Sequence, residues 1–226
     1  MLGFKEAVKR DINEAWGALE DMRVSMEKSL NLFIRLPGET ILTNEKDGIL
    51  STNFSDSIII FSSGDKREDL HRMLIMASQF FAYALNKCVP LRGAISFGEF
   101  YLNLEKNLFC GPPLIEAYEI GENAQWSGIV VSESFAAKYK ENPLRSSDQE
   151  VVIKYPIPTK GDPQSGWVLN WPLVFKNNFD PKISITPENF ALAFKRLFGD
   201  YNSWSPNVKK IYENTVEFIN LMLSPK

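Results

Sequence analysis

The hydrophobic positions along the chain divide it into segments of helical and of strand-like spacing. Apolar side chains recur every three or four positions from residue 4 to about residue 36, which predicts a helix that ends at Pro37-Gly38. Two strand-like runs, 49–54 and 57–62, then flank Ser55-Asp56 and predict a hairpin. Because the second run contains four consecutive apolar residues, we expect this strand to be covered on both faces.

The rest of the chain continues the alternation of helices with short strands. Expected helices lie at 66–87, 111–124, 134–140, 187–199 and 206–223, and expected strands at 91–97 (continued by 98–101), 108–110, 128–131, 151–153 and 167–169. This order predicts an α/β fold, specifically an α+β sandwich in which helices flank a mostly antiparallel sheet. Prolines become frequent after residue 142, so we divide the chain into 1–141 and a C-terminal extension, 142–226, that packs on it.

Composition and charge exclude several classes of function. The net charge is −3, and no cluster of Lys and Arg offers the footprint of a nucleic-acid-binding domain. Cys88 and Cys110 have no CxxC spacing, so neither a zinc site nor a disulfide framework is expected. The single histidine, His71, is expected on an exposed helix face. No signal-peptide pattern and no apolar run of membrane-spanning length is present, so we predict a cytoplasmic protein without a membrane partner.

Asp56 is the first candidate for chemistry, because an acid between two apolar strands needs a reason to be there. One interpretation is structural: its carboxylate accepts hydrogen bonds from amides of its own turn. The other is functional: the carboxylate binds a hard cation such as Mg²⁺, which takes one or two carboxylates and completes its shell with phosphate oxygens and water. The residue alone does not decide between them.

Four segments in order resemble the class III nucleotidyl cyclases. They are Phe54-Ser55-Asp56-Ser57-Ile58-Ile59-Ile60-Phe61, Leu91-Arg92-Gly93-Ala94-Ile95-Ser96-Phe97-Gly98-Glu99, Gly111-Pro112-Pro113-Leu114-Ile115-Glu116-Ala117-Tyr118-Glu119 and Gly128-Ile129-Val130-Val131-Ser132. The similarity covers residues 54 to 135 and is closest to a divergent bacterial branch, of which the pyrimidine cyclases of antiphage signalling are the best-known members. The resemblance implies the class III cyclase fold and a homodimer with its site at the interface.

The resemblance also implies that two aspartates bind two Mg²⁺ or Mn²⁺ ions, of which one matches Asp56. Phe54, Ser55 and Ser57 would then lie in the nucleotide site. The other aspartate ends a first strand whose pattern continues as Leu2-Gly3-Phe4, so we expect that this strand and its acid either precede Met1 or have been lost from this protein. Leu2, Gly3 and Phe4 would bind phosphate through their N–H groups at a helix start. The alternative is that these three residues are an ordinary entry to a helix.

The helix after Gly111 departs from the family pattern. Conventional members carry Asn and Arg where this chain has Ile115 and Glu119, and neither residue can support a ribose or a phosphate in the usual way. Arg92 is the remaining candidate cation, either gripping a phosphate or base carbonyl or pairing with Glu99, Glu116 or Glu119. Glu116 and Glu119 share a helix face that could contact the nucleotide, a second subunit or Arg92.

From this resemblance we expect a nucleotide cyclase. Its substrate would be a nucleoside triphosphate, with UTP and CTP as candidates, and its products a 3′,5′-cyclic nucleotide and pyrophosphate. The product would act as a second messenger in antiphage defence. The alternative is a catalytically inactive cyclase-like module that binds a nucleotide or a protein, or a scaffold that has kept the fold alone.

Overall fold

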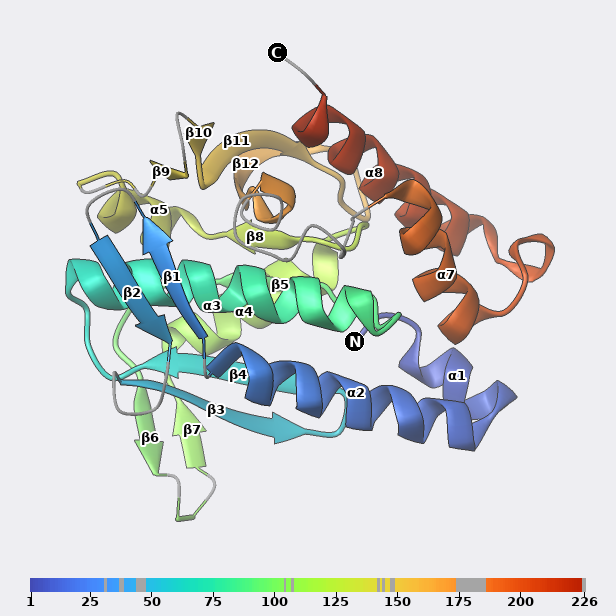
Figure 1. Ribbon diagram of the computed structural model, residues 1–226, viewed down its shortest axis with the longest axis horizontal. Helices are drawn as coiled ribbons and strands as arrows, with labels where there is room; N and C mark the ends of the chain where they lie inside the picture. The colour runs from blue at the N-terminus through green and yellow to red at the C-terminus, as the bar shows by residue number, and fades with distance from the viewer. Residues whose placement is uncertain are drawn as a thin grey trace.

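The structure is a computed structural model. It describes residues 1–30, 32–36, 39–43, 48–103, 105–106, 108–141, 143, 145–146, 149–173 and 186–224, with side chains described for all but a few of these. Helices flank mostly antiparallel sheets, as the sequence predicts (Figure 1). Among the described residues, no helix combines the length and the apolar character needed to cross a bilayer.

The N-terminal segment is not one helix, so the prediction of a helix over residues 4–36 is wrong. Asp11 adopts an extended conformation (φ −156°) and separates α1 (Phe4–Arg10) from α2 (Ile12–Leu30). The following residues form β1 (Leu32–Leu36), which pairs antiparallel with β2 (Glu39–Thr43). The periodicity failed here because a short apolar segment fits helical and strand spacing equally well. The predicted helix end at Pro37-Gly38 lies outside the described residues.

The predicted hairpin is present as β3 (Ile49–Phe54) and β4 (Ser57–Ser62), joined by a turn at Ser55 and Asp56. Ser55 has a positive φ of 54°, as a tight hairpin turn requires. The expectation that β4 is covered on both faces is wrong for most of the strand, since its residues Ile58, Ile59 and Ile60 are only half buried. The following helix, α3 (Arg67–Asn86), packs against this hairpin and runs alongside it (Figure 1).

The central segment contributes four strands of three residues each and two helices. These are β5 (Gly93–Ile95), β6 (Tyr101–Asn103), β7 (Leu108–Cys110), α4 (Pro112–Asn123), β8 (Ile129–Val131) and α5 (Glu133–Tyr139). β6 and β7 form the expected hairpin, while 91–92 and 96–100, predicted as strand, lie outside β5. Gly111 precedes α4, and a Cβ at this position would lie 2.5 Å from the carbonyl oxygen of Glu99.

The segment after residue 142 completes the main sheet. After the short pair β9 (Arg145–Ser146) and β10 (Gln149–Glu150) come β11 (Val152–Ile157) and β12 (Gln164–Leu169). The four-stranded sheet has the order β11-β12-β8-β5, in which only the β5–β8 pair is parallel. The chain closes with α7 (Pro187–Phe198), a 3₁₀ turn, η2 (Tyr201–Ser203), and α8 (Pro206–Leu223), which lie at one end of the molecule (Figure 1).

The last helix is fixed to the loop before β8 by packing and by hydrogen bonds. The fully buried Trp126 ring stacks on Tyr155 of β11, with ring centroids 5.5 Å apart, and meets Phe218 of α8 edge-on at 4.8 Å. The hydroxyl of Thr215 accepts a hydrogen bond from the Ser127 N–H at 2.8 Å. The C-terminal helix is therefore part of the core of the protein.

Arg196 of α7 connects its helix to α2 and to the end of α3. Its guanidinium binds Glu14 and Asp21 of α2, the latter at 2.8 Å, and donates to the carbonyl of Lys87 after α3. The side chain is 19% exposed, so these contacts are only partly screened by water.

Replacing Arg196 by methionine should lower the free energy of unfolding by about 1–3 kcal/mol, because two partly buried carboxylates lose a charged hydrogen-bond partner. Arg23→Met is the matched control, since the Arg23–Glu27 pair is exposed and contributes about 0.5 kcal/mol or less. Urea denaturation of both variants measures the difference. Equal losses of unfolding free energy in the two variants would show that the Arg196 contacts contribute no more than an exposed ion pair.

Candidate functional site

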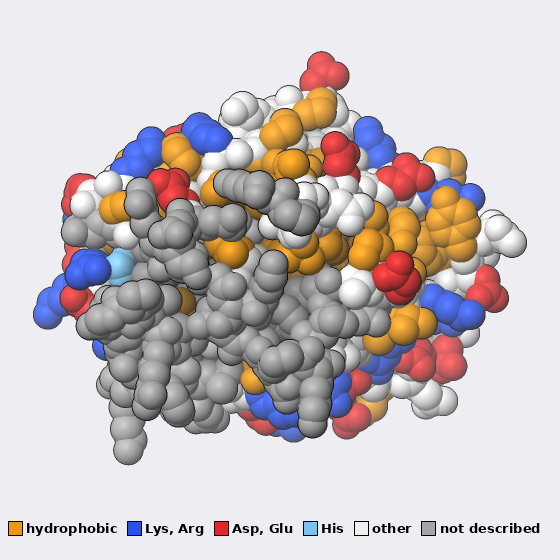
Figure 2. Space-filling model, turned by 45° about the horizontal axis from the view of Figure 1, so that its top comes forward, with side chains coloured by type: hydrophobic (Ala, Val, Ile, Leu, Met, Phe, Trp, Pro, Cys, Tyr) orange, Lys and Arg blue, Asp and Glu red, His pale blue; other side chains and the backbone are white. Residues whose placement is uncertain are grey.

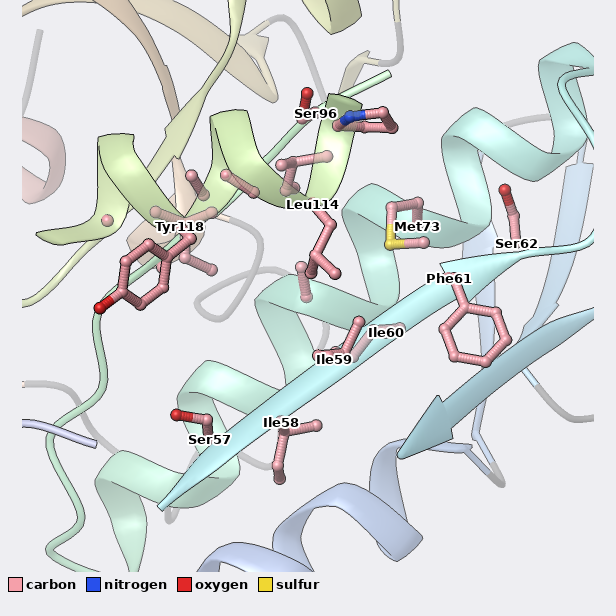
Figure 3. Close-up of a pocket in the computed structure, with 18 of the residues that line it drawn as sticks. Ser57, Ile58, Ile59, Ile60, Phe61, Ser62, Met73, Ser96, Leu114 and Tyr118 are labelled. Carbon is pink, nitrogen blue, oxygen red and sulfur yellow. The ribbon is translucent and has the colours of Figure 1, made fainter. Parts of the chain in front are cut away.

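A cavity of about 990 Å³ lies between β4 and the segment that contains β5. Its other two walls are α3, through residues such as Phe81, and α4, through Leu114 and Tyr118. Figure 3 shows Leu114 of α4 and Ile59 of β4 on opposite sides of this space. Voids of this size are absent from close-packed protein interiors, so the cavity is a candidate binding site.

The cavity has a polar end at the turn of the β3–β4 hairpin. Asp56 lines this end, and its side chain is 31% exposed. The Met1 nitrogen lies 2.7 Å from the Asp56 carbonyl oxygen and 3.6 Å from its carboxylate. Among the described residues, no amide of the turn donates to this carboxylate, so the structural interpretation of Asp56 is not what the geometry shows. The carboxylate faces the cavity and the start of α1.

Arg92 lies at the same end of the cavity and has protein partners. Its guanidinium forms an ion pair with Glu122 of α4 at 2.5 Å and donates to the carbonyl of Ala124 at 3.1 Å. The pairing with an acid was one of the alternatives, but the partner is a glutamate that the sequence did not single out. The Met1 nitrogen is within electrostatic reach of Asp56, Arg92 and Glu122, which places all four groups together.

The start of α1 is only partly suited to bind phosphate. Gly3 precedes the helix with a positive φ of 76°, and a Cβ there would lie 2.5 Å from the Phe198 ring. Phe4 is the first residue of α1. Leu2 is buried, and its N–H already donates to the Pro90 carbonyl at 3.0 Å, so it is not free to bind a phosphate. Glycine is required here, yet the helix it begins has only seven residues.

The two glutamates expected near the nucleotide do not line the cavity. The Glu116 carboxylate accepts hydrogen bonds from the hydroxyls of Ser96 and Ser134, the latter at 3.0 Å, and so connects α4 to the loop after β5 and to the start of α5. Glu119 is exposed on α4, and Ile115 on the same helix is 61% exposed. These positions contribute no donor to the polar end of the cavity.

Beside Asp56, the hairpin turn presents one large aromatic side chain. Phe54 is 84% exposed, although aromatic side chains of this size usually bury much of their surface. Ser55 and Ser57, two more of the residues predicted to contact the nucleotide, lie on either side of Asp56, and Ser57 lines the cavity. Phe54, Ser55 and Ser57 therefore lie together at the hairpin turn, while Glu116 and Glu119 do not join them, and contact of the first three with a nucleotide stays a prediction.

The structure corrects one further expectation and agrees with another. His71, expected on an exposed helix face, is only 1% exposed, because α3 packs against both α2 and the β3–β4 hairpin and buries most of its residues. The electrostatic character of the surface agrees with the composition: Figure 2 shows Lys and Arg side chains interspersed with Asp and Glu on the face it presents. That face offers no extended basic patch among the described residues.

The residues present fit one hard cation and not two. At the polar end Glu122 is paired with Arg92, whereas the partner of the Asp56 carboxylate is the N-terminal ammonium of Met1, at 3.6 Å, and not a side chain. Among the described residues, no group of three or more His, Cys, Asp and Glu side chains is placed to hold a metal. One Mg²⁺ can be held by a single carboxylate when phosphate and water complete its shell. A second ion would need another carboxylate.

Comparison of the chain with protein-family models, with curated proteins and with solved structures finds no match in any of the three.

Proposed function

We propose that this protein is a nucleotide cyclase of the class III type. The observation that supports the proposal is the Asp56 carboxylate, which projects from a hairpin turn into the polar end of a large cavity, beside Arg92 and the start of α1. This is the place where the resemblance expects an acid that binds the metal carried by a triphosphate.

The reaction would join the ribose 3′-oxygen to the α-phosphorus. The 3′-hydroxyl loses its proton, the bond between the α-phosphorus and its bridging oxygen breaks, and pyrophosphate leaves. Asp56 would hold a divalent ion, and that ion would neutralise charge on the triphosphate. The second ion expected of this family requires a carboxylate that the described residues do not supply. UTP and CTP are the candidate substrates, and the product would be a signal in antiphage defence.

A cyclase-like module without catalytic activity is the second candidate. Ile115 and Glu119 favour it, because both lie on the exposed surface of α4 and neither offers a donor to a ribose or a transferred phosphate. Such a module would bind a nucleoside triphosphate, or a protein partner, without turning the nucleotide over. A homodimer is expected for either candidate, and Mg²⁺ or Mn²⁺ for the enzyme.

Incubation with each of the four nucleoside triphosphates and Mn²⁺, followed by mass spectrometry, separates the two candidates. A cyclase yields a cyclic nucleotide and pyrophosphate from at least one triphosphate. We expect the 226-residue chain to convert the triphosphate slowly, because one carboxylate does not hold two metal ions. Binding of a triphosphate without any product would support the inactive module, and neither binding nor product would refute both the cyclase and the nucleotide-binding module.

A further inference from the structure

Tyr118 is an aromatic side chain that lines the cavity and is nevertheless exposed. It belongs to α4 and is 70% exposed, although tyrosine rings usually bury much of their surface. Within the described part of the chain, its hydroxyl forms no hydrogen bond and its ring contacts no other aromatic ring. The side chain therefore presents both its ring face and its hydroxyl to a ligand in the cavity.

The position of Tyr118 on α4 places it near the polar end of the cavity. Residues three and four apart share a helix face, so Tyr118 lies beside Gly121 and Glu122, which line the same cavity. Glu122 is the residue that pairs with Arg92 at the polar end. Figure 3 shows the Tyr118 ring projecting from α4 at the end of the cavity where β4 begins with Ser57. The ring thus lies toward the same end as the proposed metal ligand.

The wall of the cavity beside Tyr118 is formed in part by bare backbone. Gly121 lies so close to β5 that a Cβ on it would be 3.8 Å from the Cα of Gly93. A Cβ on Gly93 would meet no atom within 4 Å, so open space adjoins this residue. Both glycines line the cavity. A flat ligand group can therefore lie beside the Tyr118 ring without meeting a side chain from either glycine.

The group of a nucleotide that suits these features is its base. The face of a tyrosine ring packs well against another flat ring system, whereas a phosphate needs cations or N–H donors. Four residues of helix, about 6 Å along α4, separate Tyr118 from Glu122 at the polar end. This separation leaves room for a ribose between a base on the ring and phosphates beside Asp56.

We propose that Tyr118 is the stacking surface for the base of the bound nucleoside triphosphate. The inference rests on the proposed function, since it takes the phosphates to be bound beside Asp56, and it adds the residue that holds the base. Because every nucleobase has a π-face, the ring raises the affinity for all four bases to a similar degree. The choice among bases is left to groups that meet the edge of the stacked base.

Equilibrium binding of unreactive triphosphates tests the stacking role. The probes are the α,β-methylene analogues of UTP, CTP, ATP and GTP with Mg²⁺, in which carbon replaces the bridging oxygen that the proposed reaction releases. Inorganic tripolyphosphate is the probe without a base. Tyr118→Ala and Tyr118→Leu should each weaken binding of the analogues at least about fivefold, because both remove the aromatic face, and leave tripolyphosphate binding unchanged. Tyr118→Phe keeps the aromatic face and should bind the analogues within about twofold of the unaltered protein.

Tyr101 of β6 provides the matched control. It is 65% exposed, close to the exposure of Tyr118, but it does not line the cavity. Tyr101→Ala should therefore leave the affinity for every probe within about twofold. Proton NMR gives a second measurement, since the ring current of a stacked aromatic side chain moves the resonances of the base protons upfield. We expect this shift with the unaltered protein and with Tyr118→Phe, and no such shift with Tyr118→Ala.

The outcomes separate failure of this inference from failure of the proposed function. Equal affinities of the unaltered protein, Tyr118→Ala and Tyr118→Leu for the analogues overturn the stacking role and leave the cyclase proposal in place. A parallel loss of tripolyphosphate binding also overturns it, because the side chain would then act on the phosphates or on folding. Failure of the unaltered protein to bind any analogue refutes the proposed function itself, and the stacking role with it.

Discussion

Changing Asp56 to asparagine should lower the rate of Mn²⁺-dependent formation of a cyclic nucleotide by at least about 100-fold. The change is made in a form of the protein that converts a nucleoside triphosphate to this product. Asparagine keeps the shape of the side chain but removes the charge that binds the ion, and loss of a metal's charge stabilisation costs several kcal/mol in the transition state. The measurement is the initial rate of product formation by mass spectrometry across a titration of Mn²⁺. A rate that is unchanged at all metal concentrations would rule out Asp56 as a metal ligand.

The same cavity offers a matched control for this change. Asp65 lines the cavity beyond the opposite end of β4, so Asp65→Asn removes one negative charge from the cavity but none from the polar end. We expect this variant to keep the rate of the unaltered protein within about twofold, because its carboxylate lies a whole strand away from the proposed ion. Equal losses in the two variants would point to a general electrostatic effect and away from ligation by Asp56.

Changing Trp126 to alanine should lower the free energy of unfolding by about 3–5 kcal/mol, the range for removing a buried aromatic ring. The ring is fully buried and contacts both Tyr155 and Phe218, so its loss leaves a void between the main sheet and α8. Trp16 is 62% exposed, and Trp16→Ala should change stability by about 0.5 kcal/mol or less. Denaturant unfolding of both variants provides the comparison, and similar losses would contradict the anchoring role of Trp126.

Much of the fold could be predicted from the sequence, because long periodic segments carry a strong signal. α3, α4, α7 and α8 begin and end within about two residues of their predicted bounds, and the β3–β4 hairpin was identified from its turn. The strand β1 was not predicted, because its five residues continue the helical spacing of α2 and pair only with a segment further along the chain. Such strand pairing depends on tertiary contacts, and the local spacing of apolar residues does not reveal these contacts.

The candidate site could be predicted only in part, for a related reason. Asp56 stands out locally, as an acid between two apolar runs. The partner of Arg92 is Glu122, thirty residues away on a helix whose orientation depends on the packed sheet. The cavity itself has no sequence signal at all, since it arises from the separation of β4 and β5. Local spacing therefore identifies the residues that carry chemistry. Packing of the folded chain determines which residues become their neighbours.

The strand order of the main sheet also determines when the protein can fold during synthesis. β12 pairs with β8 along its outer edge, so this edge stays unpaired until residues 164–169 have left the ribosome. The Trp126 ring stays exposed longer, because it is enclosed only after Phe218, near the end of the chain, has been synthesised. Nascent chains expose unpaired edges and apolar rings during such delays, and these are the features that chaperones recognise. Translation pauses between β8 and α8 should therefore lower the yield of soluble protein more than pauses placed earlier.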